Sequence, residues 1–136
     1  MTYVWTSDLE TKDHNIDGQH QQLFMVVNEL ISSCQVGIQG DEVKKTIDFL
    51  INYTATHFDD EEKFQIRHNY PEYARHKQFH EDFKAVIFNL AEQLIREDTG
   101  ITLTLALGNT VGGWLTNHIK KEDLRMVRHV REQSSM

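Results

Sequence analysis

Apolar residues recur every three or four positions along four long stretches of this sequence, and no other feature constrains its fold as much. Such a repeat places them on one face of an α-helix, whereas a half-buried strand would alternate at every second residue. Pro71 is the only proline, so little interrupts long helices. With 136 residues, 39% of them hydrophobic, the chain is sized for one compact core. We therefore expect a single all-α domain over residues 1–136, with an irregular N-terminal arm over residues 1–17.

Two helices are predicted in the first half of the chain. Asp17 is placed to cap the first helix, because a short acidic side chain can accept hydrogen bonds from the first free backbone amides. Gly37 and Gly40 are expected to end this helix. The second helix opens near Asp41 and continues to residues 69–71, where proline cannot extend it.

Two more helices are predicted in the second half. Pro71 suits the first position of the third helix, which ends near residues 98–100. The fourth helix covers 103–118 and contains Gly112 and Gly113, each at a propensity cost of about 1 kcal/mol. Short connections between four amphipathic helices favour an antiparallel up-down-up-down bundle with crossing angles of about 20°.

Polar residues interrupt the apolar faces of the two middle helices. His57 and Glu61 are four residues apart, which is about 40° around the helix axis and one turn along it. Both side chains can therefore reach one point. His76 and His80 repeat this spacing in the third helix.

A third polar pair has a spacing that a regular helix cannot use. His118 and Asp123 are five residues apart, roughly 140° around an unbroken helix. A shared target requires the helix to end or distort between them, and we predict a distortion over residues 119–122. His20, at the start of the first apolar face, completes a set of five imidazoles and two carboxylates.

Metal ions explain these seven buried donors better than core packing does. Burying unpaired carboxylates costs several kcal/mol each unless a cation lies close by. Seven donors exceed the four that a tetrahedral zinc ion uses, so two ions fit better than one. Mixed imidazole and carboxylate ligands suit iron, and the carboxylates are natural bridges between two ions. A single histidine on an apolar face is more often a hydrogen-bonded core residue, and His14, His68 and His129 are expected to have no metal role.

The spacing of these residues resembles the full ligand set of the hemerythrins: His20, His57-x-x-x-Glu61, His76-x-x-x-His80 and His118-x-x-x-x-Asp123. Three flanking motifs resemble the single-domain bacterial members of the family: Ile16-Asp17-x-Gln19-His20, His57-Phe58-x-x-Glu61-Glu62, and Trp114-Leu115-x-x-His118-Ile119. The resemblance spans nearly the whole chain.

The resemblance implies a cofactor of two non-haem irons that cycle between Fe2+ and Fe3+. It assigns three histidines to one six-coordinate iron: His76, His80 and His118. It assigns His20 and His57 to the other iron. Glu61 and Asp123 would bridge the two ions together with an oxo or hydroxo group. The second iron then has an open position, and the implied function is reversible O2 binding for oxygen storage, transport or delivery.

The resemblance also places four apolar residues around the O2 pocket: Phe83, Trp114, Leu115 and Ile119. Such a pocket must be dry and tight, because water reaching bound O2 would promote its loss as an inactive oxidised centre. Core packing alone could also account for each of these residues.

Two other functions compete with O2 binding. Di-iron redox enzymes of the oxidase or peroxidase type use four carboxylates and two histidines, whereas this set holds two carboxylates and five histidines. We therefore expect an oxygen-binding protein and not an enzyme. A sensor of O2, NO or redox state would need an output module, and none is recognised after residues 128–132. A separate O2-consuming partner enzyme is compatible with the sequence.

Charge and hydropathy limit the possible partners and locations. Acidic residues outnumber basic ones by 21 to 14, and the basic residues form no stripe, so nucleic acid is not an expected partner. No segment approaches the roughly 18 apolar residues of a membrane span, and no basic leader precedes the arm. The single cysteine, Cys34, agrees with a reducing compartment. We expect a monomer in the cytoplasm.

Overall fold

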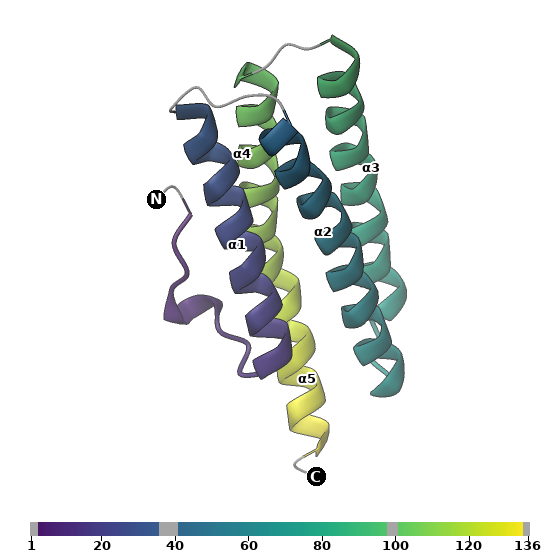
Figure 1. Cartoon of the computed structure of the whole chain (residues 1–136). Helices are drawn as coiled ribbons and strands as arrows, with labels where there is room; N and C mark the ends of the chain where they lie inside the picture. Colours follow the sequence, from purple (N-terminus) through teal and green to yellow (C-terminus); the bar gives the residue numbers. More distant parts are fainter. Residues whose placement is uncertain (1–2, 36–40, 98–100, 135–136) are drawn as a thin grey trace.

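The computed structural model describes residues 3–35, 41–97 and 101–134, and these residues form no strand. Four long rods lie side by side and alternate in direction, which confirms the predicted up-down-up-down bundle (Figure 1). Their order along the chain is a 3₁₀ turn at Ser7–Leu9, α1 (His14–Gln35), α2 (Asp41–Arg67), α3 (Tyr73–Glu97), α4 (Ile101–His118), a π-helical turn (Ile119–Asp123) and α5 (Leu124–Ser134). The predicted stop signals at Gly37, Gly40 and residues 98–100 lie outside the described residues.

Helix α1 begins earlier than predicted, and Asp17 is not its cap. Asp13 caps the helix instead, because its Oδ1 accepts a hydrogen bond from the amide of Ile16 at 3.0 Å. The Asp17 carboxylate turns back to the arm, where it accepts bonds from the amide and hydroxyl of Thr11 at 2.9 and 2.7 Å. It also accepts the amide of Lys12, whose φ of 76° lets the chain reverse here. Asp17 therefore ties the arm to the bundle.

The connection between α2 and α3 also differs from the prediction at Pro71. Asn69 adopts a left-handed φ of 54°, and its amide donates to the carbonyl of Ile66 at 3.2 Å. The amide of Tyr70 donates to the carbonyl of Gln65 at 2.9 Å, which completes a Schellman motif. This motif ends α2 before the proline. Pro71 then lies in a turn that precedes α3 and not at its first position.

The apolar faces of the four rods meet in one main core. Leu30, Leu50 and Leu107, from three different helices, are fully buried there, and Ile87 contributes from α3. A smaller cluster of Ile16, Tyr70, Met126 and Val127 closes the other end of the bundle. Among the described residues, no helix combines the length and the apolar character that crossing a membrane requires.

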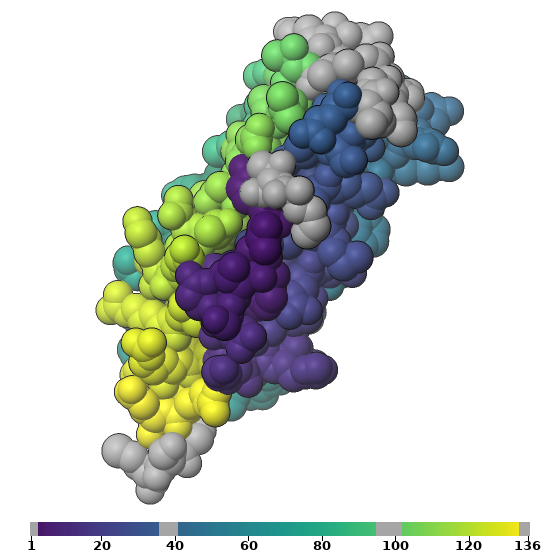
Figure 2. Space-filling view, turned by 90° about the vertical axis from the view of Figure 1, so that its left-hand side faces the viewer, coloured from purple at the N-terminus to yellow at the C-terminus, as the bar shows by residue number. Residues whose placement is uncertain are grey.

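The N-terminal arm packs across α1 and α4 (Figure 2). The amide of Tyr3 donates to Oδ1 of Asn28 at 3.0 Å, and the amide nitrogen of that side chain returns a bond to the Tyr3 carbonyl at 2.7 Å. The Tyr3 ring lies so close to Gly112 that a Cβ there would be 2.5 Å from it. The helix stays regular through Gly112 and Gly113, and the first of them makes room for the arm.

Candidate metal centre

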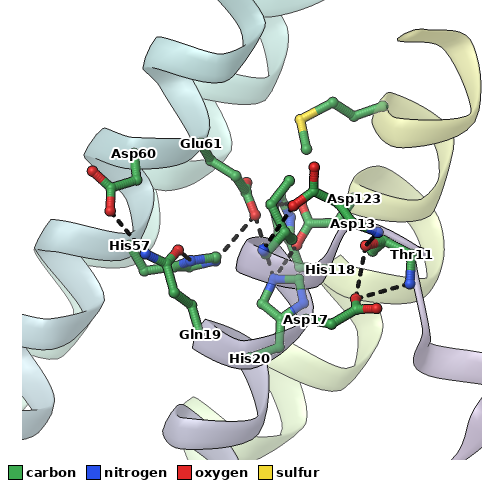
Figure 3. A network of polar contacts seen from close by, with 12 residues as sticks. Thr11, Asp13, Asp17, Gln19, His20, His57, Asp60, Glu61, His118 and Asp123 are labelled. Atoms are coloured by element: carbon green, nitrogen blue, oxygen red, sulfur yellow. Dashed lines mark hydrogen bonds and ion pairs between the residues drawn. The ribbon is translucent and has the colours of Figure 1, made fainter. Parts of the chain in front are cut away.

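The structure brings all seven predicted donors together inside the bundle. They form two overlapping groups, each with one donor atom per residue within 4.8 Å of the others: Glu61, His76, His80, His118 and Asp123; and His20, His57, Glu61 and Asp123. Every one of these side chains is buried. Each of the four rods contributes at least one of them, so the site exists only when the bundle is closed. Figure 3 shows His20, Glu61 and Asp123 pointing toward one another.

Glu61 belongs to both groups and faces each with a different oxygen. Its Oε1 lies 3.1 Å from Nε2 of His76 and 3.2 Å from Nε2 of His80. Its Oε2 lies 3.0 Å from Nε2 of His57 and 3.3 Å from Nε2 of His20. The carboxylate therefore spans the boundary between a three-histidine end and a two-histidine end of the site.

Asp123 divides its oxygens in the same way. Oδ1 lies 3.1 Å from Nε2 of His76 and 3.2 Å from Nε2 of His118, whereas Oδ2 lies 3.0 Å from Nε2 of His20. Despite these distances, neither oxygen makes a properly directed hydrogen bond. Two acceptor atoms in a fully buried carboxylate thus face the space between the imidazoles.

A π-helical turn explains how His118 and Asp123 reach the same point. Residues Ile119–Asp123 form this turn, and the amide of Leu124 donates to the carbonyl of Ile119, five residues back. An i→i+5 turn holds one residue more than an α-helical turn, so it brings a residue five positions along nearer to the same face. The predicted distortion is confirmed. The helix does not end here, since α5 continues it to Ser134.

The donor set fits a metal site. Metal–ligand bonds of about 2.1 Å place neighbouring ligands of an octahedron about 3.0 Å apart and opposite ligands about 4.2 Å apart. The contacts between donors at this site are 3.0 to 3.3 Å. Buried acceptors without hydrogen bonds are rare, and Nε2 of His80 and both oxygens of Asp123 are of this kind. Metal ions between the donors would satisfy these atoms.

Two further residues hold the imidazoles in the tautomer that a metal requires. Nδ1 of His57 donates to Oε1 of Gln19 at 2.7 Å, and the Gln19 amide donates in turn to Asp60 at 2.8 Å (Figure 3). Nδ1 of His80 donates to Oε2 of Glu62 at 2.9 Å. A proton on Nδ1 leaves the Nε2 lone pair facing the site. Sequence periodicity does not identify Gln19 or Glu62 as supports, although each directly adjoins a predicted ligand.

The carboxylates control the charge of the imidazoles when no metal is bound. Burial disfavours a charged ring, but the negative carboxylates of Asp123 and Glu61, which lie 3.0 and 3.3 Å from its Nε2, outweigh it and raise the pKa of His20 to about 9. The same balance raises the pKa of His76 to about 10. Burial opposes ionisation of Glu61 as well, yet the surrounding imidazoles hold its pKa well below the ordinary value. In the metal-free protein, protons on the histidines thus balance the two buried carboxylates.

Aromatic rings form a wall beside the three-histidine end. Phe83 stacks on Trp114 at 4.0 Å between ring centres, and Trp114 stacks on His118 at 4.2 Å. Phe58 stacks on His80 at 3.9 Å and meets Trp114 edge-on at 5.6 Å. Phe83 and Trp114 were predicted pocket residues, whereas the role of Phe58 was not predicted. The sequence feature that could have identified Phe58 is its position directly after the predicted ligand His57.

The other predicted pocket residues are buried in the main core. Leu115 is 2% exposed and Ile119 is 0% exposed, and both pack in the same cluster as Phe58 and Phe83. The three histidines without a predicted metal role stay out of both donor groups: His14, His68 and His129.

The hydrogen bond that supports His57 borders a surface cleft, although the rings of His20 and His57 are themselves buried. This cleft of about 500 Å³ opens between the start of α1 and the C-terminal half of α2, and its lining includes Gln19, Tyr53, Asp60 and Glu61. The bond between Gln19 and Asp60 therefore lies between solvent and the imidazole of His57.

Comparison with known proteins identifies relatives over most of the chain. The family model for the hemerythrin HHE cation binding domain matches residues 11–130. A bacteriohemerythrin of Stenotrophomonas maltophilia is 34% identical over 120 residues, which is 88% of this chain and 76% of that protein. A bacteriohemerythrin of Methylococcus capsulatus is 31% identical over 88% of this chain and 90% of its own length. A myohemerythrin of Riftia pachyptila is 30% identical over 90% of this chain and 89% of its own length.

Proposed function

Because this chain belongs to the hemerythrin family, we propose that it binds O2 reversibly at a non-haem di-iron centre among its four helices. The observation that carries the proposal is the division of one buried donor set into two overlapping groups that share Glu61 and Asp123. A single ion in either group would leave at least two of the seven donors without a metal. Two bridging carboxylates and five terminal imidazoles are a ligand set suited to iron.

The two ions would be held unequally. His76, His80 and His118 would complete one ion together with the bridging carboxylates, and His20 and His57 would hold the other. The second ion has one histidine fewer, so it is the ion that would offer a position to O2. When bound, the iron pair supplies the electrons and the coordination site for this exchange.

The protein's own residues would keep this exchange reversible. Gln19 and Glu62 orient the rings of His57 and His80, so that the ligand set is preformed. Phe58, Phe83 and Trp114 exclude water from the three-histidine end by stacking on its imidazoles and on one another. A dry surrounding on this side of the site limits the access of water and protons to the iron pair.

We propose a binding protein and not a redox enzyme. Five neutral imidazoles offset less of the iron charge than carboxylates would, which disfavours the higher oxidation states that oxidase chemistry needs. Storage, transport and delivery of O2 to a consuming enzyme are all compatible with such a site, and NO is a further ligand of suitable size. A monomer formed by one domain over residues 1–136, in the cytoplasm, stays a prediction.

The decisive experiment loads the metal-free protein with ferrous iron without air and counts the bound metal. Visible absorption is then recorded through repeated cycles of air and deoxygenation. We expect two irons per chain and an absorption band that appears with air and disappears with its removal. One iron per chain would contradict the di-iron centre. Two irons that oxidise permanently on first exposure would contradict reversible O2 binding and favour a redox enzyme.

A further inference from the structure

A bidentate ion pair joins the two segments that carry His76 and Asp123. Nη1 and Nη2 of Arg75 donate to Oε1 and Oε2 of Glu122 at 2.7 and 3.1 Å. Arg75 directly precedes His76 in α3, and Glu122 directly precedes Asp123 in the π-helical turn. The pair therefore connects the backbones of two donors whose side chains approach to 3.1 Å inside the site.

The Asp123 carboxylate is contacted by three imidazoles of the site at 3.0 to 3.2 Å, but it makes no directed hydrogen bond to the surrounding helices in the described part of the chain. Its backbone belongs to a π-helical turn, a conformation that is rare and less regular than the α-helix. A small shift of this turn would move both oxygens relative to the imidazoles. The position of Asp123 thus depends on what holds the turn against the neighbouring helix.

The geometry of the ion pair restricts the distance between α3 and the π-helical turn. The Glu122 side chain is 10% exposed, so its carboxylate is largely removed from water, and the planar guanidinium meets it with two parallel bonds. Arg75 is itself oriented by the ring of Phe79, with its Cζ 4.9 Å from the ring centre. An isolated, exposed pair would contribute little, but this geometry is neither isolated nor fully exposed.

A second ion pair extends the connection to α5. Nε of Arg125 lies 2.9 Å from Oε2 of Glu72, whose other oxygen lies 3.9 Å from Arg75. The hydroxyl of Tyr70 donates to the same carboxylate at 3.3 Å. Charged groups from the start of α3, the π-helical turn and α5 therefore interlock beside the site.

We propose that Arg75 and Glu122 are positioning residues for Asp123: their bidentate ion pair holds the π-helical turn at the distance from α3 at which one carboxylate serves both halves of the site. This inference rests on the proposed di-iron function for its consequence, iron retention. The conformational part concerns the turn itself and is present without metal.

The test compares Glu122→Gln and Arg75→Lys with the control Lys84→Met. The first variant keeps the size of the side chain and removes its charge, and the second keeps the positive charge but not the forked geometry. The control removes an exposed ion pair between Lys84 and Glu81 elsewhere on α3. If Glu122→Gln does not fold, Arg75→Lys carries the test alone.

Amide hydrogen exchange in the metal-free protein reports on the turn. The amide of Leu124 donates the π-helical bond to Ile119, so we expect it to exchange about tenfold faster in Glu122→Gln, with a smaller increase in Arg75→Lys. Exchange at Val27, in the core of α1, should stay at the wild-type rate in every variant. A purely structural role would accelerate both amides together, which would overturn the proposal.

Iron retention gives the second readout. After loading with ferrous iron, we expect about tenfold faster loss to a chelator in Glu122→Gln, and wild-type loss in Lys84→Met. Wild-type exchange at Leu124 together with wild-type iron loss in both ion-pair variants would overturn the proposal. If the wild-type protein itself binds no iron pair, the proposed function fails, while the exchange of Leu124 still decides whether the ion pair holds the turn.

Discussion

The two ends of the candidate metal centre differ in what surrounds them. The three-histidine end lies against an aromatic wall in which Trp114 stacks on His118 and Phe58 stacks on His80. Beside the two-histidine end, Gln19 links His57 to Asp60, and both Gln19 and Asp60 line the surface cleft between α1 and α2. The same four helices thus enclose one end in packed rings and place a polar hydrogen-bonded link between the other end and a surface cleft.

The residues that orient the histidines also differ between the two ends, in their charge. Glu62, an anion, accepts the Nδ1 proton of His80, whereas Gln19, a neutral amide, accepts that of His57. An anionic acceptor makes an imidazole a stronger electron donor than a neutral one does. The difference suits one end to holding an ion permanently and the other to exchanging a ligand.

Replacing Glu61, which both ends share, should have the largest effect. In Glu61→Gln, one of the two oxygens that face the imidazoles becomes an amide nitrogen, which cannot ligate a cation. We expect iron binding to fall from two equivalents to one or none, measured by metal analysis after anaerobic loading. Glu29→Gln, an exposed glutamate on α1, serves as the control and should keep two equivalents.

Replacing Gln19 and Glu62 one at a time should show whether metal affinity at the two ends is supported independently. Loss of such a hydrogen bond typically weakens metal affinity by about 10- to 100-fold. We expect Gln19→Ala to weaken only the step that fills the two-histidine end, and Glu62→Ala only the other step. Ferrous titration against a competing chelator resolves the two steps. If both variants weaken both steps equally, the ends are not independently supported.

The amino-acid sequence predicts the bundle and the donors well because both depend on helical periodicity. His57 with Glu61, and His76 with His80, follow from spacing alone, and the five-residue step to Asp123 even predicts the distortion that the π-helical turn provides. Periodicity does not say how a helix end is capped. Asp13 and Asp17 are equally suitable caps by residue type. Only the three-dimensional structure distinguishes them, because the hydroxyl of Thr11 engages the Asp17 carboxylate and Asp13 accepts the helix amide.

What the sequence does not predict depends on contacts between helices. Gln19 and Glu62 support histidines of other helices, and Arg75 meets Glu122 across 47 positions. Such partners have no spacing rule, because the distance between them is set by packing. Phe58 is a similar case, since its ring meets an imidazole of a neighbouring helix.

The protonation of the metal-free site should make its stability depend on pH in a way that the loaded protein does not share. The pKa values of His20 and His76 are raised to about 9 and about 10. Their contribution is therefore fully present below the ordinary histidine pKa of about 6.5 and is lost as pH rises through these values. The lowered pKa of Glu61 stabilises the fold at pH values above the ordinary glutamate pKa, and this contribution is lost as the pH falls through the lowered pKa.

We expect the thermal midpoint of the metal-free protein to decline between about pH 7 and pH 10, since both raised histidines lose their protons there. Iron binding replaces these protons, so loading near pH 7.5 should release them, which a pH-stat measures directly. A midpoint that is flat over this range, or loading without proton release, would contradict cationic histidines at either end of the site.

The smallest expected effect on the metal site comes from opening its apolar side without replacing a ligand. Leu115 lies three residues before His118 and is 2% exposed, so Leu115→Ala should leave a cavity and cost about 2 to 5 kcal/mol of stability. Leu30→Ala creates a similar cavity ten residues along α1 from His20, roughly 15 Å away. Both variants should lower the thermal midpoint, but only Leu115→Ala should lose reversible absorption several-fold sooner in cycles of air and deoxygenation, because only it admits water beside His118. Equal lifetimes in the two variants would mean that the apolar wall stabilises the bundle without protecting the metal site.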